Sequence, residues 1–338
     1  MSKKFYVTDC EGPLSINDNA YEICDYFIND GANFFSILSN YDDILAQQNE
    51  DYLAGTTLKF IVPFLKAHDL TNEDIIDYSE DNIFLLNGAL DMIKYVQDMM
   101  PFYIVSTSYV QYIKALCNYT GFIFENTYST QLDLNNYNLA YDEQDKLFEI
   151  YDNILFDSSF ENIDHIFKNT ISNMDVSNLM NSINPVGGIG KRNAILDIIS
   201  KNNYEPYNLM YSGDSITDKE ALEYTKDNDG LSISFNGNEF SIDSAEISIA
   251  SENNLILGVL AEIFNNKSKE GVYDFIHNYH EDPLESILSS SNNKGLIQDL
   301  LLNKPSIDIV NDNNKKELIN TSKIVRNKVR GINISNLG

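Results

Sequence analysis

Near the N-terminus the sequence reads Phe5-Tyr6-Val7-Thr8-Asp9-Cys10-Glu11-Gly12-Pro13. The apolar run around Val7 predicts a short buried strand, and Gly12-Pro13 predicts the turn that ends it. Asp9 and Glu11 then lie just beyond a strand end, which is where open α/β sheets place their ligands. One carboxylate could attack a substrate while the other moves a proton. An isolated acidic pair at a turn is more often solvated, so the rest of the chain has to decide between the two interpretations.

The composition is that of a globular protein. The chain has 338 residues, 43% of them hydrophobic, and its 21 tyrosines and 18 phenylalanines are enough for a sizeable core. This length allows one large domain with insertions, or two domains. The net charge of −28 argues against binding to nucleic acid or to an anionic membrane, since both would repel the chain.

The start of the chain predicts a cytoplasmic protein. Two lysines precede the first strand, no signal-peptide pattern follows them, and no apolar run approaches the roughly 20 residues that span a bilayer. The three cysteines are too far apart for a disulfide framework or a zinc site. On a strand, the side chain of Cys10 points away from those of Asp9 and Glu11, so we expect it to have a packing role. We expect the four histidines on the surface: His68, His165, His277 and His280.

Helices dominate the segment that follows the first strand. Residues 14–85 contain helical patterns and no convincing strand up to about residue 82, which predicts a compact helical insertion. Strands are then predicted at Phe102–Val105 and Gly121–Phe124, on either side of the helix Val110–Asn118. A strand, a helix and a strand of these lengths form a βαβ unit and indicate a parallel sheet.

The rest of the chain adds three strands and three further segments. Residues 131–184 are acidic and rich in Asn, which predicts a surface insertion. Strands follow at Asn208–Tyr211, Leu231–Phe235 and Ala245–Ala250, and the last 70 residues are predicted to be helices and loops. Lys315–Arg330 carries six of the 23 basic residues. Such a helix could contact a membrane or an acidic partner, or it could dock on the protein's own acidic surface.

Four groups of polar residues fall at strand ends or at a helix start, in chain order: Asp9 with Glu11, Ser106, Lys191, and Asp214 with Asp218. Together they supply what phosphoryl transfer needs. One carboxylate can form an aspartyl-phosphate, and a second can protonate the leaving oxygen. A hydroxyl at a helix N-terminus and a lysine can hold phosphate oxygens. The remaining aspartates complete an all-oxygen site that suits Mg²⁺.

Each of these residues also has a simpler explanation when it is taken alone. Ser106 could cap the following helix, Lys191 could be solvated after a glycine loop, and Gly213-Asp214 could be an ordinary turn. Their joint occurrence, in order and on the right elements, favours the chemical interpretation.

The motifs resemble those of the haloacid dehalogenase superfamily, and within it the phosphoserine-phosphatase-like group. The segment Asp9-Cys10-Glu11-Gly12 is similar to the first motif, Ser106 to the second, Lys191 to the third, and Gly213–Asp218 to the fourth. The resemblance implies a doubly wound, Rossmann-like parallel α/β sheet with an inserted all-helical cap. It divides the chain into a catalytic core (1–13, 86–130 and 185–265), a cap (14–85), an acidic helical insertion (131–184) and a C-terminal helical extension (266–338).

The resemblance also implies a role for each site residue. Asp9 would be the nucleophile and Glu11 the general acid and base, while Ser106 and Lys191 would bind the phosphate. We place Thr107 with these phosphate-binding residues. Mg²⁺ would be held by Asp9, by the backbone carbonyl of Glu11 and by Asp214, with Asp218 as a ligand or as a partner of the ligands.

Two positions depart from the common pattern of the group. The second acid is usually Asp but here is Glu11, as in the related enolase-phosphatases, and Pro13 replaces the usual Thr or Val. Proline has no N–H and fixes φ, which would reshape the turn behind the nucleophile. The same start, followed by Asn17-Asp18-Asn19-Ala20-Tyr21-Glu22, is similar to archaeal proteins of this superfamily that are described as subunit R of energy-converting hydrogenase A.

The leading hypothesis is a Mg²⁺-dependent phosphatase that hydrolyses a small phosphorylated metabolite through a phospho-aspartyl intermediate. The alternative is a catalytically weak regulatory or assembly subunit with the same fold, which would bind a protein partner through the C-terminal extension. We expect neither a nucleic acid nor a membrane as partner. The cap should close over the site and exclude bulky substrates.

Overall fold

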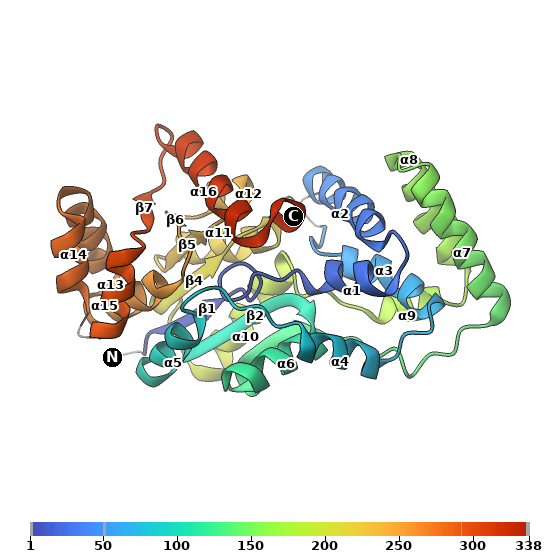
Figure 1. Cartoon of the computed structure of the whole chain (residues 1–338), viewed down its shortest axis with the longest axis horizontal. Helices are drawn as coiled ribbons and strands as arrows, with labels where there is room; N and C mark the ends of the chain where they lie inside the picture. The colour runs from blue at the N-terminus through green and yellow to red at the C-terminus, as the bar shows by residue number, and fades with distance from the viewer. Residues whose placement is uncertain (1–2, 50–51, 292, 336–338) are drawn as a thin grey trace.

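The computed structural model describes residues 3–49, 52–291 and 293–335. The ends of the predicted core segment 1–13 and of the predicted extension 266–338 therefore lie partly outside the described residues. A single seven-stranded sheet forms the centre of the molecule, in the order β3-β2-β1-β4-β5-β6-β7 (Figure 1). Neighbouring strands are parallel from β3 to β6, and only β7 runs antiparallel to its neighbour. The strands are β1 (Phe5–Thr8), β2 (Phe102–Tyr109), β3 (Thr127–Thr130), β4 (Leu209–Gly213), β5 (Leu231–Phe235), β6 (Ile247–Ala250) and β7 (Ser306–Ile309). The predicted doubly wound α/β fold is confirmed.

Helices cover both faces of the sheet, and alternate residues of β1 show why. Successive side chains of a strand point to opposite faces. Phe5 and Val7 pack on one face, against helices α10 (Ile189–Asn202) and α11 (Lys219–Asp227). Tyr6 packs on the other face. That second face is covered by α5 (Ala89–Met99), α6 (Val110–Thr120) and α13 (Leu255–Glu281).

The helices beyond the sheet form one body, which we call the cap. Its first part, after β1, holds α1 (Asn19–Phe27), α2 (Gly31–Gln48), α3 (Thr57–Ala67) and α4 (Asn72–Asp81). Its second part, after β3, holds α7 (Tyr141–Phe156), α8 (Phe160–His165) and α9 (Ser177–Ser182). The sequence assigned the two parts to a cap and to a separate surface insertion. In the structure they share a single hydrophobic cluster, in which the Phe34 ring lies 4.8 Å from the Tyr151 ring.

One predicted strand lies elsewhere in the chain, and one observed strand was not predicted. The third strand was expected at Gly121–Phe124, but β3 begins at Thr127. Gly121 instead ends α6 in a left-handed conformation, and Ile123 is exposed, so this apolar stretch is a connection. The second correction is β7, in a segment that was predicted to be only helices and loops. Ile307 of β7 is buried and pairs with Ile249 at the edge of the sheet.

The C-terminal extension returns to the sheet and then reaches the cap. After α13 it contains α14 (Pro283–Ser290), α15 (Lys294–Leu302), β7, α16 (Lys315–Arg330) and α17 (Ile332–Ser335). Helix α16 packs beside β6, and Ser322 donates a 2.7 Å hydrogen bond to the carbonyl of Gly237. In α17, Ile334 packs against the hydrophobic cluster of the cap. The basic helix therefore docks on the protein's own core, which was one of the two predicted alternatives.

No helix among the described residues combines the length and apolar character needed to cross a bilayer.

Candidate active site

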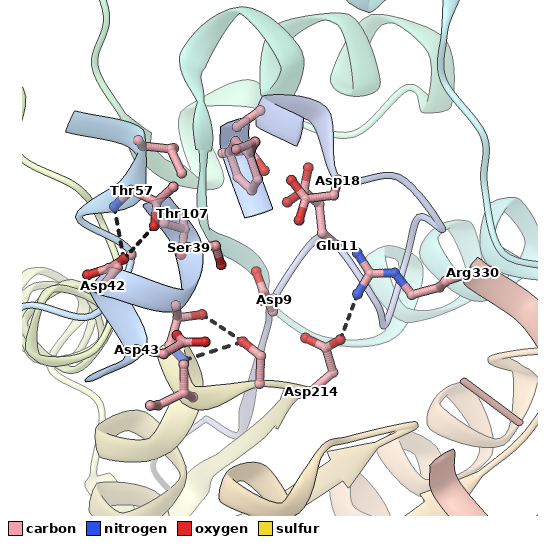
Figure 2. Close-up of a pocket in the computed structure, with 18 of the residues that line it drawn as sticks. Asp9, Glu11, Asp18, Ser39, Asp42, Asp43, Thr57, Thr107, Asp214 and Arg330 are labelled. Atoms are coloured by element: carbon pink, nitrogen blue, oxygen red, sulfur yellow. Dashed lines mark hydrogen bonds and ion pairs between the residues drawn. The ribbon is translucent and has the colours of Figure 1, made fainter. Parts of the chain in front are cut away.

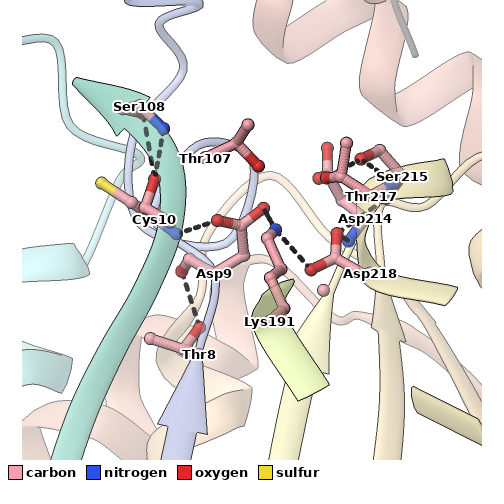
Figure 3. Close-up of polar contacts among 12 residues, drawn as sticks. Thr8, Asp9, Cys10, Thr107, Ser108, Lys191, Asp214, Ser215, Thr217 and Asp218 are labelled. Atoms are coloured by element: carbon pink, nitrogen blue, oxygen red, sulfur yellow. Dashed lines mark hydrogen bonds and ion pairs between the residues drawn. The ribbon is translucent and has the colours of Figure 1, made fainter. Parts of the chain in front are cut away.

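Asp9 lies directly after β1, between the ends of β2 and β4 (Figure 3). Its N–H donates to the carbonyl of Ser212 in β4 at 2.8 Å, and its Oδ1 accepts a 2.7 Å hydrogen bond from the N–H of Cys10. After β1 the chain forms β2 and β3 on one side of this strand, and then β4, β5 and β6 on the other side. Doubly wound sheets bind their ligands at the point where the strand order reverses in this way. The side chain of Cys10 is fully buried in the core on one face of the sheet, as its predicted packing role requires.

Lys191 joins Asp9 to Asp218 inside the protein. Its ammonium lies 2.6 Å from Asp9 Oδ2 and 2.7 Å from Asp218 Oδ1, and the Lys191 side chain is fully buried (Figure 3). Burial alone would lower the pKa of Lys191, but the carboxylates of Asp218 and Asp9 raise it above its usual value. Lys191 is therefore a fixed positive charge beside Asp9.

Asp218 is bonded on both of its oxygens. Tyr211 donates to Oδ1 at 2.6 Å, and the N–H groups of Asp214 and Ser215 donate to Oδ2 at 2.9 and 3.1 Å. Burial favours the neutral acid, but Lys191 and these donors outweigh it and lower the pKa of Asp218. Asp218 thus orients Lys191 and the backbone of Asp214.

Asp214 lies after β4 and faces Asp9. One carboxylate oxygen each of Asp9, Asp214 and Asp218 lies within 4.8 Å of the others, and all three residues are buried. The turn that follows β1 packs closely against Asp214. A Cβ at Gly12, where φ is +102°, would lie 2.4 Å from Asp214 Cγ. Only glycine fits this backbone position without strain.

Two arginines of the C-terminal extension also reach Asp214, and the sequence did not predict them as site residues. Arg326 bonds to Asp214 Oδ2 and, at 3.2 Å, to the Asp214 carbonyl. Arg330 bonds to the same Oδ2 at 3.0 Å (Figure 2). Both arginine side chains are buried. The one signal in the sequence was the density of basic residues in α16, which does not indicate where the helix docks.

Glu11 and Asp18 form the side of the site next to the cap. Glu11 Oε1 accepts a 2.8 Å hydrogen bond from the N–H of Asn19, at the start of α1. Burial, together with the nearby carboxylate of Asp18, raises the pKa of Glu11 well above its usual range. A carboxyl group whose pKa is raised by its surroundings is suited to general acid catalysis.

The end of β2 contributes hydroxyl groups, but not in the predicted arrangement. The predicted strand ended before Ser106, whereas β2 continues to Tyr109 with a shift in register. Ser106 is buried and shares a 2.9 Å hydrogen bond with Ser108. Thr107 and Ser108 line the cavity beside Asp9, whereas Ser106 is not among the described lining residues. Ser108 was not predicted as a site residue, because the strand was expected to end before Ser106.

The site faces a small cavity of about 90 Å³ between the core and the cap (Figure 2). The cap is in contact with the core beside it, since a Cβ at Gly187 would lie 2.2 Å from the carbonyl oxygen of Ala54. The part of the lining that comes from α2 and α3 includes Asp42, Asp43 and Thr57, and no basic residue. Thr57 holds Asp42 through its N–H and its hydroxyl, at 2.9 and 2.8 Å.

The carboxylates fit an oxygen-binding divalent cation. Burial is the largest factor raising the pKa of Asp9, with Asp218 and Asp214 adding to it and Lys191 opposing it. A cation beside Asp9 would favour its ionised form. The oxygens of Asp9 and Asp214 are the type that Mg²⁺ prefers.

Comparison with solved structures finds two informative likenesses. The gene product AF1437 from Archaeoglobus fulgidus is 26% identical, covers 99% of each chain and superposes with a TM-score of 0.85. Phosphoserine phosphatase in its apo form is 15% identical, with 78% of this chain and 98% of that chain covered and a TM-score of 0.50. No family model and no curated protein matches the sequence. The chain therefore has the haloacid dehalogenase-like fold that its motifs predicted.

Proposed function

We propose that this protein is a Mg²⁺-dependent phosphatase that hydrolyses a small phosphorylated metabolite through a phospho-aspartyl intermediate. One observation carries the proposal. Asp9 lies at the switch point of the sheet and lines the small cavity between the core and the cap, and the buried ammonium of Lys191 lies 2.6 Å from its Oδ2. A carboxylate fixed beside a positive charge can attack a phosphoryl group that the same charge attracts.

The chemistry takes two steps that use the same pair of acids. Asp9 attacks the phosphorus atom, the bond to the leaving oxygen breaks, and Glu11 gives that oxygen its proton. Glu11 then takes a proton from water, and the resulting hydroxide attacks the phosphorus of the phospho-aspartate, so that Asp9 and inorganic phosphate are released. The raised pKa of Glu11 supports its role as the acid in the first step.

The phosphoryl group would be held by Lys191 and by the end of β2. Lys191 forms an ion pair with Asp9 but is not among the described residues of the cavity wall, whereas Thr107 and Ser108 of β2 are. Ser106, behind them, would position Ser108 through the hydrogen bond between their hydroxyls. Mg²⁺, held by Asp9, Asp214 and the Glu11 carbonyl, would supply further positive charge to the phosphoryl oxygens.

The cavity wall suggests the class of leaving group. Asp42 and Asp43 give the cap side of the described lining no positive charge for a second phosphate or a carboxylate, and the small cavity excludes a macromolecule. We therefore expect the leaving group to be small and either uncharged or cationic, such as a hydroxyl compound or an amino alcohol.

Asp9→Asn tests the proposal. The substitution keeps the size of the side chain but removes the attacking oxygen charge, so Mg²⁺-dependent phosphate release should fall by roughly a thousandfold or more. The measurement is phosphate release from a panel of small phosphomonoesters, with the exposed Asp152→Asn as the matched control. If Asp9→Asn is as active as Asp152→Asn, the mechanism is wrong.

The arginine contacts of Asp214 favour a second candidate, a regulatory or assembly subunit with little activity. Arg326 and Arg330 bond to the oxygen that would bind the cation. A protein of this kind would release no phosphate from any member of the panel and would co-purify with a stable partner.

A further inference from the structure

Three buried side-chain cations already contact the carboxylates around Asp9. Three carboxylates form the centre of the site, and three cations contact them: Lys191, Arg326 and Arg330. Charges that are removed from water are tolerated only when they are paired. Each of the three carboxylates that could hold an ion therefore already has a cationic partner.

The two arginines supply the same charge as one divalent cation. Adding that ion while both guanidinium groups stay in place would crowd three cations around Asp214, whose side chain is only 3% exposed. Like charges at such short range repel one another strongly in a poorly solvated site.

An ion and the two arginines would also compete for the carboxylate of Asp214. Both guanidinium groups bond to Asp214 Oδ2. Arg326 has further bonds, at 3.2 Å each, to the carbonyls of Asp214 and Asn236. Arg330 donates through Nη2 to the Asn17 carbonyl at 2.6 Å, so it also holds the connection between β1 and the cap.

We propose that Arg326 and Arg330 occupy the cation position of this site, so that a divalent ion and helix α16 bind Asp214 in competition. The inference rests on the cation site of the proposed function. The arginines are positioning residues: they hold Asp214 and the cap connection together until the ion replaces them. Ser322 and Arg326 lie one turn apart on the side of α16 that meets the core, so an ion that replaced Arg326 would act on this contact face of the helix.

The test is direct titration with Mn²⁺, which binds the same carboxylate oxygens as Mg²⁺ and is followed by electron paramagnetic resonance in the absence of any substrate. Arg326→Gln removes a charge-assisted hydrogen bond to Asp214, so it should raise the affinity for Mn²⁺ by roughly ten- to hundredfold. Lys323→Gln removes the same charge from an exposed position of α16 and should leave the affinity unchanged. A gain in affinity separates competition from structural damage, which could only lower it.

Ion binding and the docking of α16 are thermodynamically linked, which allows a second measurement on the unmodified protein alone. If the ion displaces the arginines, saturating Mn²⁺ must loosen α16 in the unmodified protein. Amide hydrogen exchange in residues 315–330 should then become faster with Mn²⁺ than without it, while exchange in the strands stays the same.

Two results would overturn the proposal, and they differ in what they say about the proposed function. If Arg326→Gln binds Mn²⁺ as the unmodified protein does, or more weakly, while Asp214→Asn loses binding, the cation site stands and the competition does not. If neither Arg326→Gln nor the unmodified protein binds Mn²⁺, both the competition and the metal requirement of the proposed function are wrong.

Discussion

Gly12 shows how tightly the residues behind the nucleophile are packed. A Cβ there would lie 2.4 Å from Asp214 Cγ, and φ is +102°. Gly12→Ala should therefore be strongly destabilising, because it adds a steric clash to the cost of about 1–2 kcal/mol for a left-handed residue. Gly121→Ala is the matched control: its φ is +73°, but nothing lies within 4 Å of the added Cβ. Urea unfolding of the two variants compares them, and equal losses of stability would show that the contact with Asp214 is unimportant.

At this scale the sequence predicted which polar residues meet, but not all of their contacts. Asp9, Lys191, Asp214 and Asp218 converge as expected, because parallel strands end at one edge of the sheet. Arg326 and Arg330 could not be predicted, since a basic helix more than 100 residues from Asp214 carries no local signal of where it docks. Ser108 reaches the cavity wall through a register shift in β2, and the pattern of apolar residues does not predict such a shift.

Glu22, in the first turn of helix α1, allows a test of how stability depends on pH. Both carboxylate oxygens of Glu22 accept hydrogen bonds from Asn17 Nδ2, at 3.0 and 2.8 Å, but burial raises the pKa of Glu22 to about 7. The folded state thus holds this proton more tightly than the unfolded chain, so stability falls as pH rises from the unfolded value of 4.5 through the folded value.

Glu22→Gln removes this titration and keeps an oxygen for Asn17. The variant should gain stability relative to the unmodified protein between about pH 5 and about pH 8, as measured by urea unfolding at both values. The exposed Glu80→Gln serves as the control and should show no such change. A stability difference for Glu22→Gln that is the same at both pH values would contradict the burial of its charge.

Among the elements, the buried parallel strands and the amphipathic helices were predictable, and the edges of the sheet were not. Residues at the centre of the sheet are buried on both faces, which gives continuous apolar runs such as Phe5–Val7. The edge strands β3 and β7 are short, and only parts of them are buried. The apolar stretch Gly121–Phe124 therefore resembles a buried strand more closely in sequence than β3 or β7 does, although it is a connection.

The whole molecule consists of a sheet core and a cap whose two parts come from distant segments. The pattern of either part predicts helices, but their common cluster depends on contacts between them that no local pattern shows. Phe34 of α2 lies 4.8 Å from both Phe64 and Tyr151, measured between ring centres, and is fully buried.

Phe34→Ala should therefore loosen both parts of the cap together. Truncating a buried Phe costs about 3–5 kcal/mol, so amide exchange should become faster in α7 as well as in α1–α3. Hydrogen exchange with mass spectrometry measures this, and Phe156→Ala, at a side chain that is 93% exposed, is the control. Faster exchange confined to residues 14–85 would show that the second part of the cap is stable without the first.

The central claim is that Asp9 carries the phosphoryl group during turnover. The most direct measurement is an acid quench of the protein during steady hydrolysis of para-nitrophenyl phosphate with Mg²⁺, followed by peptide mass spectrometry. We expect the peptide containing Asp9 to gain the mass of one phosphoryl group, and the same peptide of the Asp9→Asn variant to gain none. Phosphate release without any label on this peptide, or with the label on another residue, would contradict it.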